Sequence, residues 1–170
     1  MSRIRLVLLV VVLITISSVA VVQAQVMNGA GSFQLTLAGY QLQGRLTNST
    51  LFHNNTVAMS MGVDYADRTN IGQVSINSKG NWYGMANGTN LEGIIYGVNG
   101  IVQVCYVFYC GNANYVGYGT WDGMLSSDRS EAQGTFQGII VFTNSQITGI
   151  TLNKPVQMSG TWNSTLQSSS

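Results

Sequence analysis

The stretch SFQLTLAGYQLQGRL, residues 32–46, places apolar side chains at every second position of its first half. Phe33, Leu35 and Leu37 share one face of an extended strand, and the polar residues between them share the other. A period of two is the signature of a β-strand with one buried face. Since no longer window shows the period of an amphipathic helix, the chain is predicted to be all-β.

Similar segments recur about every 8–14 residues along the chain, close to the spacing of ~8–12 residues that is typical of all-β folds. Turn signals separate them, among them NGT at 87–89 and VNG at 98–100, because Asn-Gly pairs favour tight hairpins. QITGITL at 146–152 is predicted to be one of the strands. The pattern indicates an antiparallel sandwich or barrel of about 8–10 short strands.

The N-terminus has the three parts of a secretory signal. Two arginines precede an apolar run, and Val22 and Ala24 occupy the small-residue positions before a cleavage site. We therefore predict a signal peptide over residues 1–24 and a single all-β domain over residues 25–170, secreted or held at the cell surface. An uncleaved membrane anchor is the alternative, because the run is about long enough to span a bilayer. No second run of that length follows, so no membrane span is expected after cleavage.

Charged residues are scarce, at 8% of the chain, whereas an average domain contains about a quarter. The seven basic residues form no cluster, which argues against a nucleic-acid partner. Aromatic and β-branched residues are plentiful, which argues against disorder. The surface is therefore expected to owe its polarity to Asn, Gln, Ser and Thr.

The hexapeptide GNWYGM around Trp82 recurs as GTWDGM around Trp121 and, truncated, as GTWNST around Trp162. In each copy a glycine and the tryptophan two positions later share one strand face. The indole then has room to lie over a neighbouring backbone, which favours core tryptophans at bends of the sheet. The alternative is that the three rings form a stacking platform for a sugar or another small ligand.

The stretch IVQVCYVFYC, residues 101–110, contains both cysteines of the chain, Cys105 and Cys110. Cysteines of exported proteins are usually oxidised. Five residues of extended strand span about 16 Å, whereas a disulfide requires Cα atoms within about 7 Å. The sequence therefore predicts an intrachain disulfide with the strand broken between the cysteines, and two buried free thiols are the alternative. Both faces of this stretch are apolar, which indicates a central strand or one whose outer face meets another molecule.

Four Asn-X-Ser/Thr triplets are candidate N-glycosylation sites in an exported protein. They are centred on Asn48, Asn54, Asn87 and Asn163. A glycosylated asparagine is expected on an exposed loop, although a chain rich in Asn and Thr also forms such triplets by chance.

No catalytic residue is predicted. His53 is the single histidine and lies beside a candidate glycosylation site, so a Ser-His-Asp triad is not expected. Glu92 and Asp122 are the best candidates for a catalytic carboxylate pair, but carboxylates at such positions are more often surface charges. Two cysteines and one histidine make no recognisable zinc site, so we expect neither a metal site nor a cofactor.

The sequence favours a non-enzymatic, β-rich surface glycoprotein with a structural or adhesive role. A strand within residues 25–40 could complete the open sheet of a neighbouring subunit, with Phe33, Leu35 and Leu37 filling pockets. In its signal, N-terminal strand, low charge and sequons the chain resembles donor-strand surface-filament subunits, such as archaeal thread-type filaments and fimbrial pilins. The resemblance implies self-association. The alternative is that residues 32–46 form the protein's own first strand.

A small binding module is the second functional hypothesis. The Gly-x-Trp triplets resemble lipocalin- and avidin-like barrels, which place this signature on the first strand, whereas here it recurs in the middle and at the end of the chain. The resemblance implies a carbohydrate or small apolar ligand bound through tryptophan and tyrosine side chains.

Overall fold

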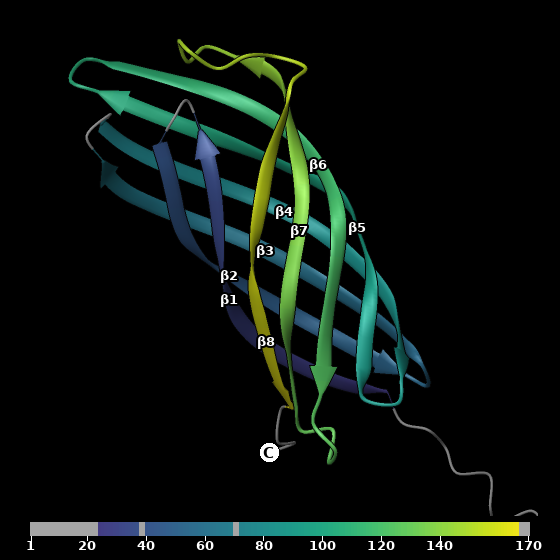
Figure 1. The fold of residues 1–170 in the computed structure, drawn as a ribbon. Coiled ribbons are helices and arrows are strands. Elements are labelled where there is room, and N and C mark those ends of the chain that lie inside the picture. The colour runs from purple at the N-terminus through teal and green to yellow at the C-terminus, as the bar shows by residue number, and fades with distance from the viewer. Residues whose placement is uncertain (1–23, 38–39, 70–71, 167–170) are drawn as a thin grey trace, which may run out of the picture.

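The fold is an eight-stranded antiparallel barrel in which each strand pairs with the next and β8 closes on β1 (Figure 1). It is seen in a computed structural model that describes residues 24–37, 40–69 and 72–166. The strands are β1 Gln25–Leu37, β2 Tyr40–His53, β3 Thr56–Thr69, β4 Gly72–Asn87, β5 Asn90–Tyr106, β6 Tyr109–Leu125, β7 Glu131–Ser145 and β8 Pro155–Leu166. No helix in these ranges is long and apolar enough to cross a membrane.

The prediction of an all-β antiparallel fold is confirmed, and of the two predicted architectures the barrel is observed. The strands are 12 to 17 residues long rather than short, because segments separated by apparent turn signals run on as one strand. The predicted turn at 98–100 lies inside β5, next to a register shift between Ile95 and Val98. Gly97 there has a φ of 62°, so a bulge replaces the hairpin. Residues 146–152, predicted as a strand, lie in the β7–β8 loop.

Apolar side chains fill the interior of the barrel. Along β4 buried and exposed residues alternate from Val74 to Trp82, and the buried apolar residues of the described strands form one core. The outward side chains of β1 and β2 include the exposed Gln34, Thr36 and Gln43. The outer face of β4, β5 and β6 also presents exposed apolar side chains, among them Tyr83, Met85, Ile94, Tyr96, Tyr118 and Met124. The interior of the barrel is filled by a side-chain core.

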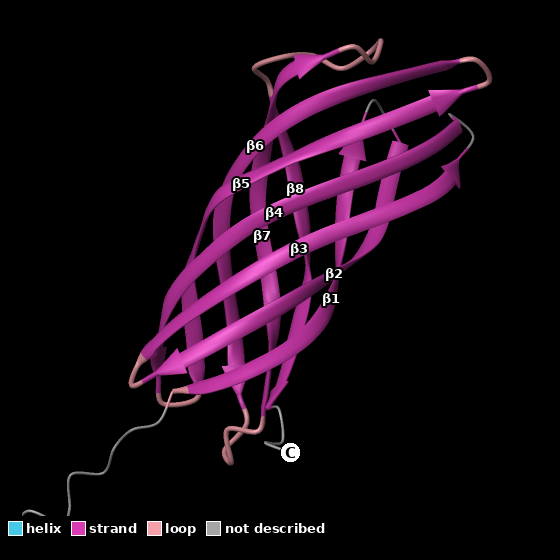
Figure 2. Ribbon diagram, turned by 180° about the vertical axis from the view of Figure 1, so that it is seen from behind, coloured by secondary structure: helices cyan, strands magenta, loops and turns pink. Residues whose placement is uncertain are grey.

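The two ends of the barrel carry different structures (Figures 1 and 2). One end, here called the hairpin end, carries the β5–β6 turn at 107–108 and the β7–β8 loop at 146–154. The opposite end carries the β2–β3 and β4–β5 turns and the β6–β7 loop at 126–130. Side chains on the last residues of β5 and the first residues of β6 are therefore presented beyond the hairpin end.

The strand β1 completes this protein's own barrel. It pairs with β2 along its whole length and with β8 from Met27 to Leu35, and Phe33 and Leu35 are buried in the interior. The predicted signal peptide, residues 1–24, lies outside the described residues except for Ala24, and the side chain of Leu37 is outside them too. The donor-strand prediction is corrected, because both edges of β1 are already occupied within the chain.

Candidate functional site

A disulfide between Cys105 and Cys110 closes the β5–β6 hairpin. The two residues are direct cross-strand partners, with Cα atoms 4.1 Å apart. The strand ends at Tyr106 and resumes at Tyr109, so the predicted disulfide and the predicted break between the cysteines are both confirmed. Val107 has a φ of 50°, in the left-handed region that two-residue hairpin turns use.

The four residues between the cysteines, here called the hairpin tip, are all apolar or aromatic and face solvent. Phe108 is 101% exposed and Val107 75%, while Tyr106 and Tyr109 behind them are more than half exposed. Single exposed apolar residues are common on proteins, but a contiguous group of them marks an interaction surface. The hairpin tip presents the most exposed of the apolar side chains, Phe108 and Val107, and is the candidate functional site.

The hairpin is held to the neighbouring β7–β8 loop. The hydroxyl of Tyr109 donates a hydrogen bond to the carbonyl of Gln146. The Gln146 N–H donates to the carbonyl of Asn112 at 2.7 Å, and the Asn112 N–H donates to Gln146 Oε1 at 3.3 Å. Together with the disulfide, these bonds orient the hairpin before it meets a partner, which lowers the entropic cost of binding.

The whole hairpin is uncharged. No Asp, Glu, Lys or Arg occurs between Glu92 and Asp122. Directly behind the disulfide, the exposed side chains of Gln103 and Asn112 face each other as a cross-strand pair. Polarity therefore rises stepwise from the apolar apex, through the tyrosines, to this amide pair.

Replacing both cysteines (Cys105→Ala with Cys110→Ala) is expected to lower the free energy of unfolding by about 2 kcal/mol. The reason is that a cross-link over so short a loop removes about that much chain entropy from the unfolded state. Urea denaturation measures the change, with Ser60→Ala on the outer face of β3 as the control. Alkylation of two thiols in denatured but unreduced protein would contradict the bridge.

Glu92 and Asp122, the strongest candidates for a carboxylate pair, are direct cross-strand partners on β5 and β6. Both are exposed on the outer surface of the barrel, in a depression of about 560 Å³ that Tyr83 and Ile94 also line. Asp122 Oδ1 accepts a hydrogen bond from the hydroxyl of Thr135 at 3.0 Å. Carboxylate catalysis relies on a buried group beside a polar one, and here both carboxylates are open to water. Glu92 and Asp122 are therefore charged residues of the outer surface.

Asp128 organises the β6–β7 loop at the opposite end. Its Oδ1 accepts hydrogen bonds from the hydroxyl of Ser126 at 2.6 Å and from the N–H and hydroxyl of Ser130 at 3.1 and 2.8 Å. These bonds favour the ionised form, with that from Ser126 foremost, and hold the pKa of Asp128 at about 2. Asp128 is a turn residue, a role in which aspartate is common because its side chain bonds to the backbone a few residues on.

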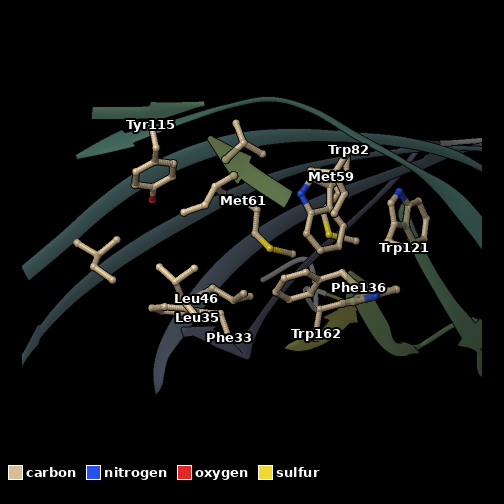
Figure 3. Close-up of a cluster of buried hydrophobic side chains, with 14 of the residues drawn as sticks. Phe33, Leu35, Leu46, Met59, Met61, Trp82, Tyr115, Trp121, Phe136 and Trp162 are labelled. Carbon is tan, nitrogen blue, oxygen red and sulfur yellow. The ribbon is translucent and has the colours of Figure 1, made fainter. Parts of the chain in front are cut away.

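The three repeated tryptophans lie in the core on alternate strands β4, β6 and β8, so each repeat is a two-strand unit (Figure 3). Ring centroids of Trp121 and Trp162 are 5.5 Å apart, and those of Trp82 and Phe136 are 5.1 Å apart. Because each indole is at most 4% exposed, the rings offer no stacking face to solvent. The ligand-platform prediction is corrected accordingly, and the core interpretation describes the observed packing.

The interior contains little free space. A cavity of about 60 Å³ lies between Phe33, Met61, Trp82, Val98 and Phe136. Sites for drug-sized ligands measure about 300–1,000 Å³. Within the described residues, the core therefore leaves no room for a sugar or a lipid-sized ligand.

Tyr115 of β6 is buried in the core of the barrel. Tyr115 packs edge-on against Phe142, with ring centroids 5.8 Å apart. Burial raises the pKa of the Tyr115 hydroxyl, and a hydrogen bond with the side chain of Ser78 opposes this shift. A neutral, buried phenol of this kind is a packing residue.

Three of the four candidate glycosylation sites are accessible. Asn54, next to the exposed His53, lies in the β2–β3 turn, and Asn87 lies at the β4–β5 turn. Asn163 is exposed on the outer face of β8, where its Oδ1 accepts a hydrogen bond from the Ala30 N–H at 3.0 Å. The geometry at the two turns fits the expected exposed loops, whereas Asn163 is on a strand.

Asn48 is instead buried inside the barrel, at 5% exposure. Its Nδ2 donates a hydrogen bond to the Asn163 carbonyl at 2.8 Å. Its Oδ1 accepts hydrogen bonds from the hydroxyls of Thr50 and Ser164. The prediction of an exposed loop at Asn48 is wrong, because on β2 it shares the inward parity of Leu46.

Sequence reasoning assigned no residue of the hairpin tip to a function. The available signal was the apolar character of both faces of residues 101–110, which indicated a contact with another molecule. Two readings of that pattern were open, and only the exposure of Phe108 decides between a central buried strand and an outward contact.

No family model matches the chain, and no curated protein matches it significantly. Among solved structures, Ail, the attachment invasion locus protein of Yersinia pestis, in complex with the heparin analogue sucrose octasulfate, is similar with a TM-score of 0.54 and 9% identity over 84% of this chain and 96% of that one. The ywiB protein from Bacillus subtilis overlaps 85% of this chain and 94% of its own with 10% identity, at a TM-score of 0.33. The chain is thus an antiparallel β-barrel similar in fold to Ail.

Proposed function

We propose that this protein is a non-enzymatic barrel that acts outside the cell and attaches to another surface through its hairpin tip. The observation that supports this most strongly is the full exposure of Phe108 at the apex of a disulfide-closed hairpin. Disulfides persist in oxidising compartments, so the bridge agrees with the export predicted from residues 1–24. The role proposed is adhesive or anchoring.

The chemistry of attachment is proposed to be apolar rather than ionic. Ail is named as an attachment protein and was solved with a sulfated sugar analogue, which identifies a polyanion as one kind of ligand for that protein. In this chain charged residues make up only 8%, and the hairpin has none between Glu92 and Asp122. A polyanion therefore has no cluster of cations to bind at this site, whereas an apolar surface has the tip.

The test is the attachment of labelled protein to cells of the producing organism. A fluorophore attached at the C-terminus reports on binding, since the last described strand, β8, ends at Leu166 on the end of the barrel opposite the tip. The double variant Val107→Asn with Phe108→Gly is expected to reduce attachment about tenfold or more, since two exposed apolar side chains are removed. Asparagine tolerates the positive φ observed at position 107, and glycine adopts any φ at position 108, so the variant is expected to fold.

The matched control is Met124→Ser, which removes a 59% exposed apolar side chain near the opposite end of β6. It is expected to leave attachment unchanged. Equal attachment of the wild type and the double variant would overturn the proposed function.

A further inference from the structure

We infer that the surface to which the hairpin tip attaches is a lipid bilayer, into whose interface the tip inserts. This inference rests on the proposed function and names its partner. Val107 and Phe108 would enter the outer acyl region, and Tyr106 and Tyr109 would lie at the level of the headgroups.

The order of side chains along the hairpin matches the polarity of a membrane interface. The apex is purely apolar, the residues behind it are tyrosines more than half exposed, and the next exposed cross-strand pair is Gln103 and Asn112. Tyrosine favours the boundary between hydrocarbon and water because its ring is apolar and its hydroxyl polar. The amide pair would stop insertion about 13 Å from the apex, given the rise of ~3.3 Å per strand residue.

The absence of charged residues on the hairpin lowers the free-energy cost of inserting it into a membrane interface. A charged side chain carried into the interface would have to be neutralised or remain hydrated. No such residue is present from Gly93 to Trp121, a stretch that covers the tip and most of both strands behind it. The polar groups that the hairpin itself moves toward the lipid are therefore uncharged. On the neighbouring strands, Arg68 of β3 pairs with Gln73, which is the β4 partner of Cys105.

The β7–β8 loop lies at the same end of the barrel (Figure 1) and presents a second exposed apolar side chain. Leu152 of the β7–β8 loop is 42% exposed, and the exposed Lys154 follows it. An apolar side chain next to a lysine suits an interface whose phosphates attract cations. Two contact points from separate parts of the chain suit an extended surface such as a membrane.

The acidic side chains that the structure describes gather at the opposite end of the barrel. Glu92, Asp122, Asp128 and Glu131 all lie toward the opposite end, on the first residues of β5, the last of β6, the β6–β7 loop and the first of β7. The backbone of β3 brings Asp64, Asp67 and Arg68 toward the hairpin end, so this end is not free of charge. The acids at the opposite end would face water when the tip is inserted.

The experiment places a reporter at the apex. Phe108→Trp adds an indole to a protein whose own three tryptophans are buried at 2–4% exposure, so a spectral change on adding vesicles reports on the tip. Vesicles of phosphatidylcholine, alone or with one fifth phosphatidylglycerol, are expected to shift the emission of this variant to the blue. Brominated lipids should quench it. The matched control is Met124→Trp at the opposite end, whose emission is expected to stay unchanged.

Binding is expected to be weak and reversible, because even one acyl chain gives only marginal anchoring. In flotation with the same vesicles, Val107→Asn with Phe108→Gly should reduce the bound fraction about tenfold or more. Raising the salt concentration should change binding to pure phosphatidylcholine little, since the insertion is apolar.

The outcomes separate this inference from the proposed function. If Phe108→Trp shows no shift with either vesicle while attachment to cells still requires the tip, the membrane inference is wrong and a protein or glycan receptor takes its place. Vesicle-independent dimers that are lost in the double variant would show a second copy as the occupant, which also overturns it. If the double variant attaches to cells like the wild type, the proposed function itself fails.

Discussion

Replacing Gly93 with alanine is expected to lower the free energy of unfolding by about 3 kcal/mol, which is the upper part of the usual range for overpacked cores. A Cβ at this position would lie 2.3 Å from the carbonyl oxygen of Tyr83, 2.5 Å from Trp121 Nε1 and 2.7 Å from the Cα of Gly84. Two of these atoms belong to the backbone of the adjacent strand, so they cannot move aside without disturbing the β4–β5 ladder. Urea unfolding followed by tryptophan fluorescence measures the change.

The matched control is Gly62→Ala on β3, where the nearest atom to the added Cβ is Thr47 Oγ1 at 3.6 Å. Ordinary contact of this kind predicts a change within about 0.5 kcal/mol, or slight stabilisation from the reduced freedom of the unfolded chain. Combining Gly93→Ala with Trp121→Phe should cost less than the sum of the single changes, because the smaller ring leaves room for the methyl group. An unchanged free energy of unfolding in Gly93→Ala would contradict the close approach of Trp121 and the β4 backbone to position 93.

Replacing Asn48 with aspartate is expected to destabilise the barrel by about 3 kcal/mol at neutral pH. The Nδ2 group, which donates to the Asn163 carbonyl at 2.8 Å, would become an oxygen that faces another acceptor. The new carboxylate would be buried with only the hydroxyls of Thr50 and Ser164 as donors. Thermal and urea unfolding at several pH values measure the effect.

The pH dependence of this variant has a definite sign. Burial and the facing carbonyl raise the pKa of the introduced carboxyl above its unfolded value of about 3.9. The folded state then binds more protons than the unfolded state, so stability falls as pH rises above about 4 until the folded pKa is passed. The stability gap from the wild type should narrow near pH 4, and a gap that is independent of pH would contradict the buried site. Asn54→Asp in the exposed β2–β3 turn is the control, with an expected change within about 0.5 kcal/mol.

The hairpin shows which features strand geometry can predict from the sequence and which it cannot. The distance argument requires a break between Cys105 and Cys110, and the break occurs at Val107 and Phe108. The distance argument does not predict which side chains of the hairpin point into the barrel and which point to solvent. Both faces of residues 101–110 are apolar, so the binary pattern has no polar face from which the buried one could be inferred.

The glycine-tryptophan repeat shows a similar limit. A glycine beside an indole implies close backbone approach, and the clash that a Cβ on Gly123 would make with the Trp162 ring, at 2.6 Å, is of this kind. Whether such rings face a cavity or a packed core depends on how tightly the sheet closes. The observed cavity of about 60 Å³ reflects the coiling of all eight strands, which no single segment encodes.

Turn chemistry was the least reliable guide. The Asn-Gly pair at 87–88 stands at an observed turn, whereas the one at 99–100 lies in the interior of β5. Both dipeptides have the same local preference. Long strands on either side hold the second in register, and the bulge at Gly97 absorbs the local twist.

For this protein the sequence by itself determined the all-β class, the antiparallel arrangement and the condition under which its cysteines can be joined, because these follow from periods and distances within single strands. Only the tertiary structure decided that β1 pairs with β8, that Asn48 is buried while Asn54 is exposed, and that Phe108 projects into solvent. Those outcomes depend on the register of strands far apart in the chain, where a shift of one residue moves every side chain to the other face.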